Sequence, residues 1–68
     1  MNVTINGHVE VIPDGLTVLG VLSHKKVEMP DMVSVELNGD ILDRTAFETT
    51  GLHEGDTVEF LYFMGGGQ

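Results

Sequence analysis

The feature that most constrains the fold of this 68-residue chain is a pair of Asn-Gly dipeptides, each placed between short segments of alternating residues. The first dipeptide, Asn6-Gly7, separates the alternating segments 2–6 and 8–12. Asn-Gly is the preferred sequence of a two-residue type I′ turn, because both central residues of that turn require a positive φ angle. This pattern predicts a β-hairpin over residues 2–12.

The second dipeptide, Asn38-Gly39, predicts another hairpin in the second half of the chain. Apolar and polar residues alternate over 33–37, and Ile41-Leu42 follows as a short returning strand. The pattern is again typical of two antiparallel strands joined by a tight turn.

The segment after the second hairpin leads to one more strand. Residues 43–51 are expected to be irregular or briefly helical, with Ala46 and Phe47 as anchors. A turn is expected at Glu54-Gly55-Asp56, because Gly and Asp are common turn residues. The alternation that follows predicts a last strand over 57–63.

One short helix is predicted between the two hairpins. Pro13-Asp14-Gly15 ends the first hairpin, and the Thr17 hydroxyl can cap a following helix by accepting a backbone N–H. The helix is expected over residues 18–26, although Gly20 weakens it by about 1 kcal/mol relative to alanine. A helix this short requires packing on a sheet. Its apolar face is expected to contain Val18, Leu19, Val21 and Leu22.

The order of these elements predicts an α+β fold in which a mixed sheet of four to five strands packs on one helix. The preference for right-handed crossovers favours a parallel arrangement of the first and last strands in the middle of the sheet. The layout resembles the β-grasp (ubiquitin-like) fold. One domain over residues 1–64 is expected, followed by a flexible glycine-rich tail over residues 65–68.

Composition excludes several classes of function. The chain has no cysteine, so it has no disulfide, no Cys-ligated metal and no cysteine nucleophile. Its formal net charge of −8 is opposite to that of a nucleic-acid-binding protein and disfavours anionic membranes. The same charge steers a basic protein partner toward the chain, or serves solubility alone. No signal peptide or membrane span is evident, and a cytoplasmic location is expected.

No catalytic or metal-binding constellation is evident. His8, His24 and His53 lie on separate segments without a carboxylate or cysteine at ligand spacing. Ser23 and Ser34 lack a plausible base and orienting acid. The chain is therefore expected not to be an enzyme, to have no catalytic or metal-ligating residues, and to bind no cofactor of its own.

The C-terminal end is the most informative functional feature. The last strand runs into Gly65-Gly66-Gly67-Gln68 and stops. A frayed terminus or an expression remnant is the ordinary explanation of such an end. A second explanation is a carboxylate that must thread a narrow channel to reach the active site of an activating enzyme. Glycine suits that task because it has no Cβ and tolerates many backbone conformations.

Taken in order, the motifs resemble the ThiS/MoaD sulfur-carrier family, and most closely its thiamine-biosynthesis ThiS branch. The resemblance covers nearly the whole chain. The matching stretches are Asp14-Gly15-Leu16-Thr17-Val18 with Leu22, Val35-Glu36-Leu37-Asn38-Gly39-Asp40-Ile41-Leu42 with Arg44, Leu52-His53-Glu54-Gly55-Asp56-Thr57-Val58-Glu59, and Gly65-Gly66-Gly67.

The resemblance implies a protein that carries sulfur on its C-terminus. A ThiF-type enzyme adenylates the terminal glycine carboxylate, using MgATP that belongs to that enzyme. Sulfur from a persulfide donor protein displaces AMP and leaves a thiocarboxylate, which the carrier delivers to thiazole synthase. The reactive position is expected at Gly67, with Gly66 as the alternative.

The chain departs from the family in its last residue, because the family ends on glycine and this sequence ends on Gln68. Removal of Gln68 by a peptidase is the expected explanation. The alternatives are that Gln68 is a cloning remnant or that activation tolerates it.

A partner surface is expected on the last strand. If Val58, Phe60 and Tyr62 cover the helix side, the other face is open beside the tail. An exposed apolar patch with acidic neighbours is typical of a partner interface. The alternative is that its residues pack against 43–51. The residues expected to bind the partner are Leu61, Phe63 and Met64.

Three other functions fit part of the sequence. A small subunit of molybdopterin synthase is the first, although such subunits are typically longer and carry proline before the glycines. A ubiquitin-like protein modifier is the second, and a β-grasp interaction domain with an inert tail is the third.

Overall fold

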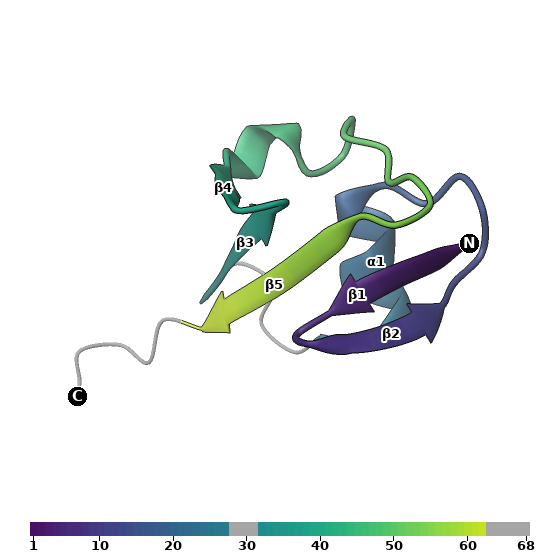
Figure 1. The fold of residues 1–68 in the computed structure, drawn as a ribbon. Coiled ribbons are helices and arrows are strands. Elements are labelled where there is room, and N and C mark those ends of the chain that lie inside the picture. The colour runs from purple at the N-terminus through teal and green to yellow at the C-terminus, as the bar shows by residue number, and fades with distance from the viewer. Residues whose placement is uncertain (28–31, 63–68) are drawn as a thin grey trace.

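The computed structural model describes residues 1–27 and 32–62. These residues form a five-stranded mixed sheet with one α-helix (Figure 1). The strand order is β2-β1-β5-β3-β4, with β1 and β5 parallel and the other neighbours antiparallel. The predicted β-grasp arrangement is therefore confirmed. The elements are β1 Asn2–Ile5, β2 His8–Val11, α1 Val18–His24, β3 Val33–Leu37, β4 Asp40–Leu42, the 3₁₀ helix η2 Arg44–Ala46, and β5 Thr57–Tyr62.

Both predicted hairpins are present. Asn6 and Asn38 have positive φ angles of 51° and 53°, and the glycine after each also lies in the left-handed region. Gly55 adopts a positive φ of 87° in the predicted turn before β5. These conformations are the ones that the Asn-Gly and Glu-Gly-Asp sequences favour.

The helix begins where the sequence predicted and ends two residues earlier. The Thr17 hydroxyl caps α1 by accepting the Gly20 N–H at 3.1 Å. The predicted end at residue 26 is wrong, because Lys26 adopts a left-handed φ of 55°. The N–H groups of Lys26 and Val27 donate to Ser23 and Leu22 carbonyls, respectively, which closes the last turn. This pattern is a Schellman termination, usually made by glycine.

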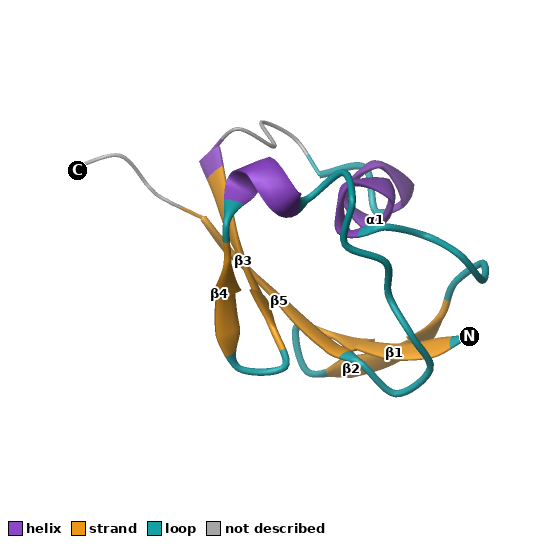
Figure 2. Cartoon of the chain, turned by 90° about the horizontal axis from the view of Figure 1, so that it is seen from above, coloured by secondary structure: helices purple, strands orange, loops and turns teal. Residues whose placement is uncertain are grey.

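The core lies between the sheet and the layer that contains α1 and η2, which both cover the same face (Figure 2). Leu19 is 43% exposed and does not belong to this core, so its predicted place on the apolar face is wrong. It points about 100° away from Val18 around the helix axis. Phe47 is buried, as predicted, and Ala46 is half-buried. The buried hydrophobic residues are Val3, Ile5, Ile12, Val18, Val21, Leu22, Val33, Val35, Phe47, Leu52, Val58 and Phe60.

The polar and apolar faces of β2 became clear only from the structure. Val9 and Val11 point to the open face of the sheet and are 71% and 78% exposed, respectively. Their neighbours His8 and Glu10 pair with buried residues of β1 and therefore share the helix side.

Among the residues that the structure describes, no helix has the length and apolar character needed to cross a membrane.

Candidate functional site

The last strand, β5, occupies the centre of the sheet. It pairs with β1 on one side and with β3 over five registered positions on the other. Val58 is fully buried and Phe60 is 8% exposed, so this strand is held by the core as well as by backbone hydrogen bonds. The chain therefore leaves a firmly held element at Tyr62, just before the glycine-rich end.

An asparagine side chain fastens each hairpin turn to β5. Asn6 Oδ1 accepts the Phe60 N–H at 2.8 Å, and Asn38 Oδ1 accepts the Thr57 N–H at 2.9 Å. Asn38 Nδ2 also donates to Asp56 at 3.1 Å. The two turns thus position β5 from both of its sides, a role that the turn motif alone does not reveal.

The turn before β5 is tied to the first strand. The Asn2 backbone and side-chain nitrogens donate to the Glu54 carboxylate at 2.8 and 3.0 Å. These two bonds lower the pKa of Glu54, the backbone bond more than the side-chain bond. Asp56 accepts the His53 N–H at 2.8 Å and closes the turn. The hydrogen bonds of the Glu54 and Asp56 carboxylates therefore hold the beginning of β5 in place.

The open face of the sheet carries Leu61 beside polar residues. Leu61 is 42% exposed and pairs with Ser34 of β3. Ile41 of β4 is 65% exposed and pairs with Glu36, which in turn faces Glu59 across the β3–β5 ladder. Paired residues share one face of a sheet. Apolar side chains and two acids are thus combined on a surface that α1 does not cover.

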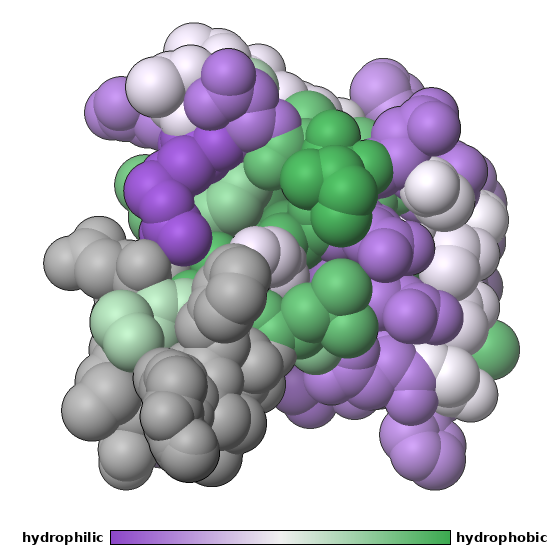
Figure 3. Space-filling view, turned by 90° about the vertical axis from the view of Figure 1, so that its left-hand side faces the viewer, coloured by the Kyte–Doolittle hydropathy of each residue, from purple (hydrophilic) through white to green (hydrophobic). Residues whose placement is uncertain are grey.

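This surface continues to the end of the molecule formed by β3, β4 and β5. Figure 3 shows hydrophobic side chains gathered there, with hydrophilic side chains on either side. Met32, just before β3, is also 42% exposed. The mixture of apolar and polar side chains is typical of a transient protein interface.

Arg44 lies beside the end of β5. Its Nη2 donates to the Val33 carbonyl at 2.8 Å, and Val33 pairs with Tyr62. Its guanidinium also lies over the Phe47 ring, with Cζ at 5.6 Å from the ring centroid. Asp43 caps η2 by accepting the Thr45 backbone N–H and hydroxyl, and these two bonds, in that order, lower its pKa. The sequence pointed to Arg44 only through the family resemblance. In the structure its contact with Val33 stabilises the end of the sheet where β3 pairs with the end of β5.

Several predicted site residues lie outside the described part of the chain: Phe63, Met64, Gly65, Gly66, Gly67 and Gln68. Their predicted roles, including attachment at Gly67, stay predictions. Of the expected partner-binding residues, the structure places Leu61 on the open face. Within residues 1–27 and 32–62, no three His, Asp or Glu side chains gather as metal ligands.

Comparisons with known proteins agree with this architecture. The ThiS family model matches residues 2–67. The crystal structure of a thiamine biosynthesis protein (ThiS) from Geobacter metallireducens is 49% identical, with a TM-score of 0.88, covering 98% of this chain and all of that one. A solution structure of a thiamine biosynthesis protein from the same organism is 48% identical, with a TM-score of 0.82, covering all of this chain and 90% of that one. No curated protein matches. The chain belongs to the ThiS family of thiamine-biosynthesis sulfur carriers.

Proposed function

We propose that the chain carries sulfur as a thiocarboxylate on its C-terminal glycine and acts as a cosubstrate without catalytic groups of its own. Family membership over residues 2–67 is the observation that carries this proposal, because the match includes the terminal glycines. The central position of β5 supports it, since a rigid strand presents the end of the chain in a defined direction.

The proposed chemistry takes place in three steps on the terminal carboxylate. A ThiF-type enzyme lets that carboxylate attack the α-phosphate of its bound MgATP, which forms an acyl adenylate and releases pyrophosphate. The persulfide of a donor protein attacks the acyl carbon and displaces AMP. A thiol then cleaves the S–S bond of the resulting acyl disulfide, which leaves the thiocarboxylate on the carrier and a disulfide on the donor side. Thiazole synthase then receives the sulfur. The carrier contributes reach and the reacting group, whereas the activating enzyme supplies the electrostatic stabilisation.

The reactive position is proposed to be Gly67 after removal of Gln68. A channel shaped for glycine excludes a glutamine side chain, because even a Cβ occupies space that glycine leaves empty. The residues around Leu61 are proposed to contact the activating enzyme before the tail enters its active site. Their exposure and acidic neighbours support this role.

The experiment is intact-mass spectrometry of two versions of the protein, one ending at Gly67 and one at Gln68. Each is incubated with the activating enzyme, ATP, a persulfide donor and a thiol reductant. The expected product is a mass shift of one oxygen-to-sulfur exchange, confined to the version ending at Gly67. Omission of ATP is the control and is expected to abolish the shift.

Both versions unmodified under all conditions would contradict the carrier function. A shift on the version ending at Gln68 would instead contradict the processing step. An adduct in which the carrier is joined to a lysine of another protein would assign the chain to the protein modifiers.

A further inference from the structure

The asparagine side chains of the two hairpin turns can react with their own backbone. An asparagine that precedes glycine can cyclise, because glycine has no Cβ to shield its nitrogen from the preceding side chain. In the second turn the Gly39 nitrogen attacks Cγ of Asn38. The Cγ–Nδ2 bond breaks, and Nδ2 takes the proton displaced from the glycine nitrogen and leaves as ammonia. The step requires no oxidant, reductant or enzyme.

Water then opens the five-membered imide at one of its two carbonyl carbons. Cleavage between Cγ and the glycine nitrogen gives aspartate in a normal backbone. Cleavage between the main-chain carbonyl carbon and that nitrogen gives isoaspartate, whose backbone runs through Cβ and Cγ and is one methylene longer. Either product carries a new carboxylate in place of a neutral amide.

The attacking nitrogen is accessible in both turns. Asn6 and Asn38 are exposed. None of the residues that the structure describes accepts a hydrogen bond from the N–H of Gly7 or Gly39. A methyl group placed on either glycine would meet no atom of a more distant residue within 4 Å, so the space beside each glycine is open.

The hydrogen bonds from the asparagines to β5 oppose the reaction in the folded chain. The Asn38 side chain accepts the Thr57 N–H at 2.9 Å and donates to Asp56 at 3.1 Å. Its Cγ reaches the Gly39 nitrogen only after the side chain turns away from β5 and both bonds break. The folded chain therefore reacts through the small population in which the turn has opened.

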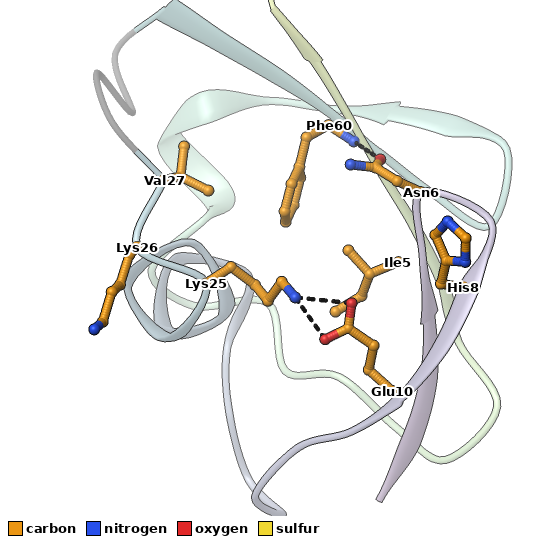
Figure 4. Close-up of a pocket in the computed structure, with 8 residues that line it drawn as sticks. All are labelled: Ile5, Asn6, His8, Glu10, Lys25, Lys26, Val27 and Phe60. Atoms are coloured by element: carbon orange, nitrogen blue, oxygen red, sulfur yellow. Dashed lines mark hydrogen bonds and ion pairs between the residues drawn. The ribbon is translucent and has the colours of Figure 1, made fainter.

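The second turn opens more readily than the first. Both bonds of Asn38 are exposed, so water replaces them with a small loss of free energy. The bond from Asn6 to the Phe60 backbone, drawn in Figure 4, is partly buried at the wall of a pocket. The second turn is also held by a shorter ladder, because β4 pairs over three positions and β2 over four. These contacts direct the reaction to Asn38.

We propose that Asn38 is a site of spontaneous deamidation and that its products loosen the beginning of β5. An aspartate at this position directs its carboxylate at Asp56, which accepts a hydrogen bond from the amide that is lost. Two carboxylates in contact repel each other, and the added methylene of isoaspartate displaces the turn. At Asn6 an aspartate still accepts the Phe60 N–H, so the same change is milder there. The proposal is independent of the proposed function.

The test follows the folded full chain at neutral pH and physiological temperature by peptide mapping with mass spectrometry. Exchange of an amide for an acid is expected about fivefold faster at Asn38 than at Asn6, because the exposed bonds open more often than the partly buried one. Asn2 precedes Val3, whose branched side chain shields the backbone nitrogen, and is expected to stay intact. In the urea-unfolded reference, Asn6 and Asn38 are expected to react at similar rates.

Variants test the two parts of the proposal separately. Asp56→Ala removes one of the bonds that hold Asn38, and is expected to raise the ratio of the Asn38 rate to the Asn6 rate about threefold or more. Asn38→Asp is expected to lower the urea midpoint more than Asn6→Asp does, and the gap is expected to close in acid, where the carboxylates are protonated. If Asn38→Asp does not fold, faster hydrogen exchange of the Thr57 amide in aged wild type provides the same test.

Four results would overturn the proposal. Equal rates at Asn6 and Asn38 in the folded chain, or a faster rate at Asn6, would remove the selectivity. An intact Asn38 in folded chain whose Asn6 has reacted would do the same. An equal loss of stability in Asn38→Asp and Asn6→Asp would show that a new carboxylate at Asn38 has no special effect on β5.

Discussion

The two Asn-Gly hairpins share one turn geometry and differ in what they do for the sheet. In both turns the asparagine has a φ near 50° and its side-chain oxygen accepts an N–H from β5. Asn38 meets β5 at its first residue, Thr57, where the bond is exposed. Asn6 meets it at Phe60, where the bond is partly buried.

The difference follows from how each hairpin pairs with β5. The β1–β5 register ends at Ile5 and Val58, so the Asn6 side chain replaces the next backbone acceptor of the ladder. The β3–β5 ladder is complete over five positions, and Asn38 adds to an already connected strand. Identical turn sequences therefore contribute unequally, because water can replace an exposed partner and not a buried one.

The hairpins also differ at their outer edges. The second ends in the three-residue strand β4, whereas the first ends in β2 with two exposed valines. The second hairpin thus mainly supports the central strand. Both outer strands are edges of the sheet, and the edge of the first hairpin carries the more exposed apolar side chains.

The largest loss of unfolding free energy is expected from removing the side chains of Asn6 and Asn38. Asn6→Ala loses the bond to the Phe60 N–H and forces alanine into a left-handed conformation, which costs about 1–2 kcal/mol for the backbone and 1–3 kcal/mol for the unpaired donor. Asn38→Ala incurs the same backbone cost, with a smaller loss of about 1 kcal/mol at its exposed bonds to Thr57 and Asp56. Urea unfolding of both variants measures the difference. Equal losses would contradict the unequal roles of the two turns.

The matched glycine variants separate the two contributions. Asn6→Gly and Asn38→Gly keep the left-handed backbone without strain and remove only the side-chain bonds. The gap between the two turns is expected to persist in this pair. If it vanishes, the difference between the alanine variants comes from the backbone and not from the contact with β5.

A smaller free-energy change is expected in partner binding. Here the exposed apolar residue Leu61 of β5 can be compared with Val9 of β2. Leu61→Glu is expected to weaken binding to the activating enzyme about tenfold, or about 1.4 kcal/mol, by placing a charge in the contact. Val9→Glu, on the edge of the first hairpin, is the control and is expected to leave that affinity unchanged. Thermal unfolding of both variants checks that each remains folded. The opposite ranking in a titration would move the enzyme contact to β2.

Lys26→Gly tests a left-handed residue whose role is confined to its backbone. Lys26 ends α1 with a φ of 55° and belongs to neither hairpin. Glycine removes the Cβ strain, and the expected gain in unfolding free energy is about 1 kcal/mol. A loss of stability in urea unfolding would show that the lysine side chain matters to the fold.

The sequence was sufficient for local structure and insufficient for contacts between distant segments. The turns, the Thr17 cap and the parallel central pair follow from local chemistry and chain handedness. The bond from Asn6 to Phe60 joins residues 54 positions apart and depends on the assembled sheet. The orientation of β2 was equally hidden, because alternation alone does not say which face a helix covers.

The candidate site was predicted from the terminal glycines and the apolar residues of the last strand. Its supports were missed because the signals were ambiguous. The sequence indicated only a turn at Asn38 and only a family motif at Arg44. The helix predicted over residues 18–26 includes Lys26, whereas this residue adopts the left-handed conformation that ends the helix.

The smallest effect is expected on stability at low pH. Glu54 accepts hydrogen bonds from the backbone and side chain of Asn2, so its protonation affects the first hairpin. Its pKa lies below the ordinary value of 4.5, so the unfolded chain binds the proton more readily than the folded one. This contribution to stability is complete above pH 4.5 and is lost as the pH falls through the lowered pKa of the folded state. Glu54→Gln is expected to reduce the pH dependence of the urea midpoint below pH 4.5, because glutamine does not titrate.

The same titration, followed residue by residue, shows which hairpin is affected. Protonation of Glu54 weakens its hold on Asn2, so the β1–β2 hairpin is expected to exchange its amide hydrogens faster in acid than the β3–β4 hairpin does. Asp43→Asn is the control, because the lowered pKa of Asp43 arises from Thr45 within η2 and leaves the first hairpin unchanged. If Glu54→Gln and wild type lose stability equally as the pH falls, other carboxylates govern the acid response, and the first hairpin has no special dependence on charge.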